Sequence, residues 1–421
     1  MRYMFTALLA VASCASIAQA QTAGTAVAEP PLTLDRALQL AGAASPSVEA
    51  ATAASQAAEA GRTVAGLRPN PEVSVTTENV AGSGTYRGFR SAETTGQLSV
   101  PLELGGKRQA RIAVADAVID RTRIGAAVTA ADLRLSITQL YIQAAAAERR
   151  VVTARDQARI ASEALRGARI RVQAGRASPL EEQRADVLRI NAEAAVERAE
   201  RLAITARGNL ARRIGTGAVQ SVDLDWFGRV GGIGPAVPVN AASTLELAAS
   251  RADVRTADAQ VRLARSQRIP NLTVFGAARR LEATNDVAAV FGVSIPLTIF
   301  NNGNAAVAQA RAQQTQAEAL SRVTALDVEQ SIANADTEVA NAATSARTAI
   351  GPSLAAAQEA ARIARIGYRE GKFGQLELLD AERTLAETRA AAIEALAAFH
   401  DAQARRERLT TPAPTNQDTD R

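Results

Sequence analysis

Cysteine, histidine and methionine are almost missing from this sequence. Its 421 residues include one cysteine, Cys14, one histidine, His400, and two methionines, Met1 and Met4. A lone cysteine cannot close an intrachain disulfide, and one imidazole without thiolates cannot complete a zinc or copper site. We therefore expect the mature chain to hold no disulfide, no tightly bound metal and no cofactor.

Aromatic residues are also scarce, at 3% of the chain, although 47% of the residues are hydrophobic. Alanine supplies much of that apolar fraction, in long stretches shared with arginine, glutamate and leucine. This composition is typical of extended helices that approach one another closely. Beyond the N-terminal segment no run of 18 apolar residues occurs, so the sequence predicts no helical membrane span.

The net charge of +5 does not indicate a nucleic-acid partner. The 48 basic residues are interspersed with 43 acidic ones, and few aromatic side chains are available to stack on bases. Solvated helix faces account for such a mixture of charges.

No catalytic constellation is visible in the sequence. His400 stands near the end of an expected helix, with arginines after it, and is interpreted as a surface residue. The glycine pairs at 105–106 and 231–232 lack the spacing of a phosphate-binding loop. We expect no catalytic residues and therefore no enzyme.

The N-terminus has the features of a secretory signal peptide. A short basic start, MRY, precedes an apolar stretch at 5–12 and a small-x-small cleavage site at 18–20. The prediction is a signal peptide over 1–20 and an exported mature chain. An alternative remains open, because residues 11–14 resemble a lipobox that would make Cys14 the lipidated first residue.

The mature sequence contains an internal duplication with a period of about 200 residues. Three pairs of segments carry it: Pro69-Asn70-Pro71 with Pro270-Asn271-Leu272, Ser99-Val100-Pro101-Leu102 with Ser294-Ile295-Pro296-Leu297, and Gly175 plus Leu180-Glu181 with Gly371 plus Leu376-Glu377. We predict a first repeat over 21–214, a connector over 215–240, a second repeat over 241–409 and a disordered tail over 410–421. Each repeat should contain a helix, two strands and a long helical hairpin.

A seven-residue apolar period runs from Gly106 to Gly175. One seam contains Ile112, Ile119, Ala126, Leu133, Leu140, Ala147, Ala154, Ala161 and Ala168, and a second contains Ala130, Ile137, Ala144, Val151, Ala158, Leu165 and Val172. Two such seams predict a coiled-coil helix, and about 65 residues give a rod on the order of 100 Å long.

Each rod is expected to turn and return as an antiparallel hairpin. Gly175 ends the first, and Ser178-Pro179 starts a return helix that should pack through two lines, Leu180, Val187, Ala194 and Leu188, Ala195, Leu202. The second rod, from about Asn304 to Tyr368, should turn at Gly371 and Gly374 and return through Leu378, Leu385, Ala392 and Phe399. Gly351-Pro352 should bend or break it.

Before each rod, two segments alternate between apolar and polar residues and predict strands. Their apolar positions are Val73 and Val75; Leu98, Val100, Leu102 and Leu104; Leu272 and Val274; and Phe291, Val293, Ile295, Leu297 and Ile299. Loops at 81–90 and 282–286 should join the strands of each pair as hairpins, and helices at 32–65 and 242–268 should precede the pairs. The passage from strand to helix is marked by Pro101, Gly105, Gly106 and Pro296.

Four strands cannot close a barrel alone, so several copies are expected to share one.

These segments resemble the TolC-like outer-membrane factors, and among them the heavy-metal channels of the cobalt-zinc-cadmium resistance type. The resemblance rests on residues 66–73, 78–84 and 98–108, and covers nearly the whole mature chain in the family's order. It implies a mainly α fold with a β membrane part. In such a fold three copies complete a twelve-stranded outer-membrane β-barrel, and their hairpins form a periplasmic helical barrel. The implied partners are outer-membrane lipid, a periplasmic adaptor and an inner-membrane resistance-nodulation-division (RND) pump.

The same resemblance assigns roles to the hairpin ends. It implies that the turns at Gly175, Ser178 and Pro179 and at Gly371 and Gly374 are periplasmic tips that dock the adaptor. It places Tyr368, Glu377 and Asp380 at a pore gate with an acidic ring. Carboxylates repeated by threefold symmetry would attract cations, although solvated helix residues are the plain alternative. At the matching positions the first repeat has Glu181 and Arg184, so the acidic character would come only from the second hairpin.

Two other functions fit the pattern less completely. A periplasmic coiled-coil adaptor or scaffold would share the rods but would need no strands of membrane length. A TolC-like duct for drugs or secreted polypeptides would share the whole architecture.

Overall fold

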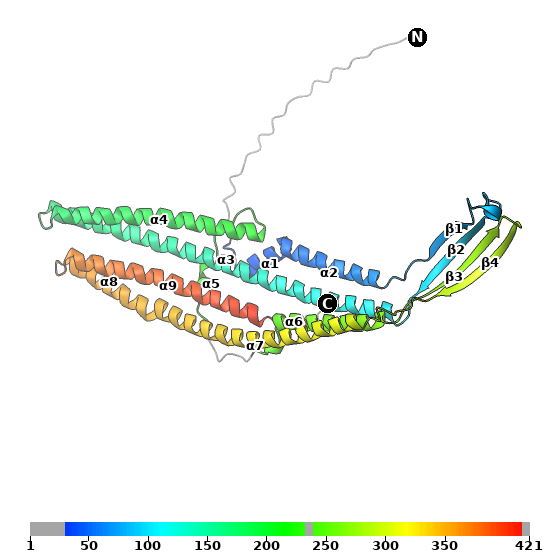
Figure 1. Ribbon diagram of the computed structural model, residues 1–421. Coiled ribbons are helices and arrows are strands. Elements are labelled where there is room, and N and C mark those ends of the chain that lie inside the picture. Colours follow the sequence, from blue (N-terminus) through cyan, green and yellow to red (C-terminus); the bar gives the residue numbers. More distant parts are fainter. Residues whose placement is uncertain (1–29, 232–238, 415–421) are drawn as a thin grey trace, which may run out of the picture.

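The computed structural model describes residues 30–231 and 239–414. Long helices lie side by side, and a sheet of four strands projects from one end of them (Figure 1). The predicted signal peptide over 1–20, with Cys14, lies outside the described residues. In the described part of the chain, no helix combines the length and the apolar character needed to cross a membrane.

The first helical segment is broken in two, whereas the sequence predicted one helix over 32–65. Helix α1 spans Leu34–Ala44 and α2 spans Pro46–Ala65. Between them Ser45 has extended backbone angles, φ −84° and ψ 119°. The cause is Pro46, which lacks an N–H and disfavours the helical conformation of the residue before it.

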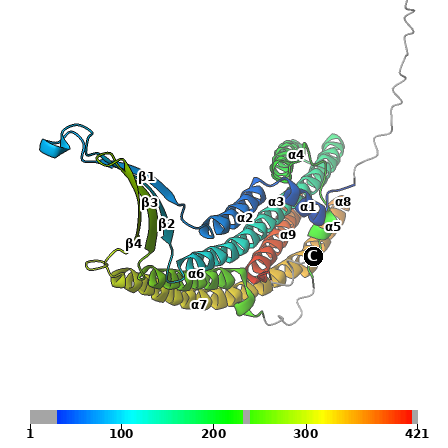
Figure 2. The same ribbon diagram turned by 90° about the vertical axis from the view of Figure 1, so that its right-hand side faces the viewer.

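The four strands form one antiparallel sheet in chain order. They are β1 (Glu72–Glu78), β2 (Glu93–Leu102), β3 (Leu272–Leu281) and β4 (Asp286–Ser294), and the loop after β1 contains the short helix η1 (Gly84–Tyr86). The register places Val73 opposite Leu98, Leu98 opposite Gly276, and Gly276 opposite Phe291. Most of the apolar residues therefore share one face, and no helix in the described part of the chain covers it (Figure 2).

The apolar alternation predicted as the last strand continues to Ile299, but β4 ends at Ser294. Pro296 has no N–H to donate, so the ladder cannot continue through it. Residues 295–303 instead lead into the next helix without regular structure.

Helix α3 (Lys107–Gln173) is one unbroken rod. Its buried side is the side that the two predicted seams occupy. Every seam residue is buried or half-buried except Ala130, which is exposed. Helix α4 (Pro179–Ile214) returns along it, but not through the predicted lines, because Leu180, Val187 and Leu202 are each more than half exposed. The contact uses alanines instead, among them Ala185, Ala199 and Ala203, because small side chains let two helices approach closely.

The second repeat has the same order of elements. It contains α6 (Leu245–Gln267), β3, β4, α7 (Asn304–Thr348), α8 (Leu354–Arg369) and α9 (Gln375–Thr410). Between α7 and α8 the π-helical turn η3 (Ala349–Ser353) holds Gly351 at φ −98° and ψ −107°, which confirms the predicted break. The return positions Leu378, Leu385, Ala392 and Phe399 are all buried.

The largest buried cluster lies at mid-height, where the connector crosses the rods. The connector contains α5 (Leu224–Phe227), and η2 (Ala241–Ser243) follows it at the start of the second repeat. Tyr141 of α3 donates a hydrogen bond to the carbonyl of Leu32 (2.7 Å) and accepts one from the amide of Asp223 (2.9 Å). The cluster thereby joins the start of the chain, the connector and both hairpins.

His400 belongs to this cluster, so its interpretation as a surface residue was wrong. Its ring stacks on Trp226 with centroids 4.3 Å apart, and its Nε2 lies 2.9 Å from the carbonyl oxygen of Phe227. Burial lowers the pKa of His400. The burial of His400 was not predicted because α9 continues to Thr410 and because the residues that cover the ring come from the distant connector.

After α9, Pro412 still forms a bridge with Thr244, and 415–421 lies outside the described residues.

Candidate functional site

The two hairpins end in the same turn. Gly175 and Gly371 both adopt the left-handed conformation, with φ of 69° and 72°. In each turn the amide after the glycine donates a hydrogen bond to a carbonyl of the preceding helix. These bonds run from Arg176 N to Arg171 O and from Lys372 N to Gly367 O, both at 2.8 Å. This is the Schellman arrangement, and glycine adopts it without strain. The predicted tips are therefore real turns.

The return helices begin differently in the two repeats. Ser178 caps α4 by accepting a hydrogen bond from the amide of Leu180 (3.2 Å), and Pro179 occupies the first helical position. Gly374 takes the capping position of α9, where the Glu377 carboxylate folds back so that a Cβ on Gly374 would lie 2.8 Å from its Oε2. A carboxylate in a first helical turn is stabilised by the helix dipole.

A set of four residues, here called the tip latch, connects the two hairpins next to these turns. Gln375 Nε2 donates to the Glu181 carbonyl (3.0 Å), and Tyr368 Oη lies 3.4 Å from the Glu181 carboxylate. Arg171 donates to the Tyr368 carbonyl (3.3 Å), with its guanidinium 4.5 Å from the centre of the Tyr368 ring. Burial raises the pKa of Tyr368, which keeps its hydroxyl a hydrogen-bond donor.

The structure brings only one of the three predicted gate residues into this latch. Tyr368 is buried in it, whereas Glu377 and Asp380 are exposed on α9. Within the described part of the chain, neither carboxylate forms an ion pair. Arg383, one turn beyond Asp380, is instead paired with Glu387 (2.7 Å).

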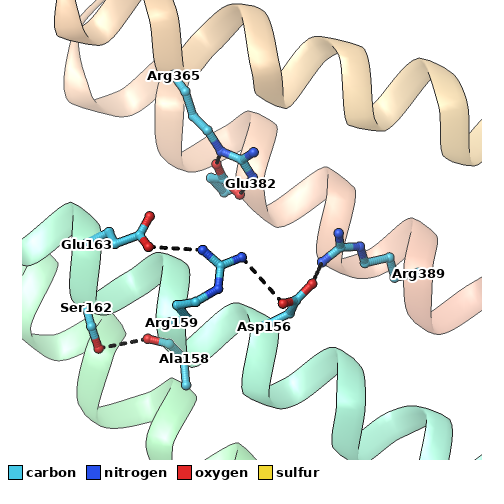
Figure 3. A network of polar contacts seen from close by, with 8 residues as sticks. All are labelled: Asp156, Ala158, Arg159, Ser162, Glu163, Arg365, Glu382 and Arg389. Atoms are coloured by element: carbon cyan, nitrogen blue, oxygen red, sulfur yellow. Dashed lines mark hydrogen bonds and ion pairs between the residues drawn. The ribbon is translucent and has the colours of Figure 1, made fainter.

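A groove of about 770 Å³ separates the hairpins above the latch. Apolar and small side chains of α3, α4 and α9 line it together with polar and charged residues, namely Gln157, Glu163, Arg365, Tyr368, Arg369, Asp380, Glu382 and Arg383. Glu163, Arg365 and Glu382 of this lining belong to a polar network of the two hairpins (Figure 3). There Asp156 of α3 pairs with Arg389 of α9 (3.5 Å) and with Arg159 (3.4 Å), while Arg365 pairs with Glu382 within the second hairpin.

The predicted strand-to-helix residues lie together at the other end of the rods. Pro101 is still within β2, paired with Thr273, and Pro296 lies two residues beyond β4. Gly105 and Gly106 both have positive φ, and Gly105 lies against Ile269. They turn the chain sharply from β2 into α3.

Sequence reasoning missed residues at both ends. At the junction Arg111 binds both carboxylate oxygens of Glu103 and donates to the carbonyls of Ala65 and Leu67. At the tip it missed Arg171 and Gln375, and it named Glu181 only as the residue matching Glu377. The duplication did contain a signal for Glu181, since it aligns this residue with Glu377.

Comparison with known proteins agrees with this architecture. A family model described as outer membrane efflux protein matches residues 37–216 and 240–410. The cobalt-zinc-cadmium resistance protein CzcC of Cupriavidus metallidurans is 33% identical over 370 residues, 85% of each chain. The nickel and cobalt resistance protein CnrC of the same organism is 30% identical over 287 residues, 66% of this chain and 68% of its own.

A solved structure shares the fold at low sequence identity. The outer membrane protein VceC of Vibrio cholerae is 17% identical, with a TM-score of 0.71 over 90% of this chain and 96% of its own. This agreement confirms the predicted TolC-like fold, mainly α with a small β part. Since the family model covers both repeats, the chain belongs to the outer membrane efflux protein family.

Proposed function

We propose that this protein is the homotrimeric outer-membrane duct of a tripartite RND export system and that it carries heavy-metal cations. The observation that supports this most is the sheet at the end of two long hairpins, which among residues 30–231 and 239–414 has two unpaired edges and an uncovered apolar face. Unpaired edges and bare apolar faces are costly for a protein in water.

Three copies remove both costs. β1 and β4 are antiparallel to each other across the sheet, so β4 of one copy can pair with β1 of the next. Twelve strands then close with their apolar face toward outer-membrane lipid and their polar face toward a lumen. The hairpins continue the wall into the periplasm, with the tips at Gly175 and Gly371 facing the adaptor and the pump.

The tip supplies the gate of this duct. The tip latch holds the second hairpin against the first, and the exposed carboxylates Glu377 and Asp380 would form a ring in a trimer. Negative potential in a narrow passage favours cations. Cobalt, zinc or cadmium would be cargo here, consistent with the names of the relatives CzcC and CnrC.

A resistance test addresses the cargo. A strain lacking the gene is expected to become sensitive to salts of some of zinc, cobalt, cadmium, nickel and copper, and the wild-type gene should restore growth. Unchanged metal tolerance with new sensitivity to drugs would favour the drug duct. A mature protein that is monomeric and soluble without detergent would instead favour the adaptor or scaffold.

The acidic ring can be tested apart from the latch. The double variant Glu377→Ala with Asp380→Ala should raise single-channel conductance in planar bilayers and weaken block by divalent cations, because the negative charges that hold cations are gone. The control is Glu387→Ala, which removes an exposed carboxylate farther along α9. Traces identical to those of the wild type would contradict the gate role.

A further inference from the structure

The segment between β4 and α7 exposes more apolar surface than the matching segment of the first repeat. Leu297 is 81% exposed, Ile299 is 74% exposed and Phe300 is fully exposed. In the first repeat Leu102 and Leu104 are both less than half exposed, and Gly105 is tucked against Ile269. Residues 295–300 are called the junction foot below.

The duplication shows where this difference comes from. Gly106 comes five positions after Pro101, but Gly303, which starts α7 in the same left-handed conformation, comes seven positions after Pro296. The two additional residues lengthen the second junction. The side chains of Asn301 and Asn302 accept hydrogen bonds from the amides of Gly303 (3.1 Å) and Asn304 (3.0 Å), so the end of the segment is held in a defined turn, with Phe300 outside it.

The foot continues the apolar face of the sheet. Phe291 and Val293 point to the same face as Leu98 and Val274. Ile295 and Leu297 follow them in the sequence with the same two-residue period. The chain then turns, and the amide of Ile299 donates a hydrogen bond to the carbonyl of Leu297 (3.0 Å). One apolar row therefore runs from β4 into the foot.

The height of that row indicates what covers it. At about 3.3 Å per residue and a tilt of about 40°, the part from Val287 to Val293 rises only about 15 Å. An outer-membrane barrel presents an apolar band about 25 Å tall. A fully extended chain to Leu297 would rise at most about 25 Å, so the row needs the foot to reach the height of the band, and the turn then leaves Ile299 and Phe300 at its lower margin.

A neighbouring copy is a poorer occupant for the foot. In a closed trimer β4 would run beside β1 of the next copy, and below Glu72 that edge contains Pro71 and Pro69. Prolines have no N–H to donate, and Pro296 interrupts the ladder on the other side. Backbone pairing between copies therefore stops above the foot and leaves it facing outward.

From the continuity of the row, its height and the fixed turn, we propose that the junction foot inserts into the periplasmic leaflet of the outer membrane. Its ligand is phospholipid, with Leu297 and Ile299 among the upper acyl chains and Phe300 at the boundary with the headgroups. The foot sets the depth at which the barrel sits. This inference rests on the proposed outer-membrane duct.

Fluorescence quenching tests the proposal on the full-length protein in proteoliposomes. Phe300→Trp is reconstituted in ordinary phosphatidylcholine and in phosphatidylcholine brominated either near the glycerol or near the chain end. The native Trp226 is half-buried, stacked on His400 in the helical part, and supplies a constant background. We expect the added tryptophan to lose fluorescence in brominated lipid, more strongly with bromine near the glycerol. Ile299→Trp serves as a second probe if Phe300→Trp assembles poorly.

Two controls separate this inference from the proposed function. Phe291→Trp, on the sheet itself, should be quenched, and Leu180→Trp, exposed near the hairpin tips, should not. Quenching of Phe291→Trp with none at Phe300→Trp or Ile299→Trp would overturn the foot and leave the duct intact. Absence of quenching at all three positions would overturn the membrane position of the sheet and the duct with it.

Discussion

The double variant Arg171→Ala with Gln375→Ala should turn a mostly closed duct into a frequently open one. It removes the hydrogen bonds from Arg171 to Tyr368 O and from Gln375 to Glu181 O, which join the two hairpins at the tip. Hydrogen bonds contribute roughly 0.5–1.5 kcal/mol each, so losing two should shift the equilibrium between closed and open tips roughly 5- to 150-fold. Single-channel recordings in planar bilayers would report this as higher open probability and conductance.

The matched control is Arg169→Ala. Arg169 lies two positions from Arg171 near the same turn, but it pairs with Glu182 (3.1 Å) and so joins α3 to α4 within one hairpin. Both variants remove an arginine charge at the tip, yet only the first disconnects the hairpins. Equal effects of the two variants would assign any change to charge and would contradict the latch. Tyr368→Phe should have a smaller effect, because its contact with Glu181 is long at 3.4 Å.

Features that depend on local periodicity and on turn residues were predictable from the sequence. The seams of α3 gave the buried side of a 67-residue helix because the seven-residue pattern is maintained over many turns. The break at Gly351 and the turns at Gly175 and Gly371 followed from the special backbone preferences of glycine and proline. The duplication then gave the same order of elements twice.

Features that depend on contacts between distant segments were not predictable. The inner side of α4 was misassigned because Leu and Val were favoured over Ala, although close helix packing selects the small residue. His400 is buried because Trp226, from a connector without periodicity, stacks on it. Of the tip latch only Tyr368 was assigned a role, and Glu181 was named only as the counterpart of Glu377. Its partners Arg171 and Glu181 belong to the other repeat and resemble ordinary surface charges in the sequence.

The second large effect is expected at the strand-to-helix junction, from Gly105→Ala. Gly105 has φ of +74°, and its new Cβ would lie 2.8 Å from Ile269 Cβ and 3.0 Å from the carbonyl oxygen of Ser266. The left-handed conformation costs alanine about 1–2 kcal/mol, and the overpacking adds about 1–3 kcal/mol. In the proposed trimer, three such junctions should markedly lower the midpoint of thermal unfolding in detergent and the yield of trimer.

The adjacent glycine separates strain from packing. Gly106 has nearly the same φ, +71°, but a Cβ added there would meet no atom within 4 Å. Gly106→Ala should therefore show only the conformational cost of about 1–2 kcal/mol. If both variants lower the unfolding midpoint equally at one scan rate, the close contact with Ile269 and Ser266 does not hold the junction. A larger loss for Gly105→Ala means that α3 leaves the sheet at an angle that only glycine permits, because the end of α6 occupies the space beside it.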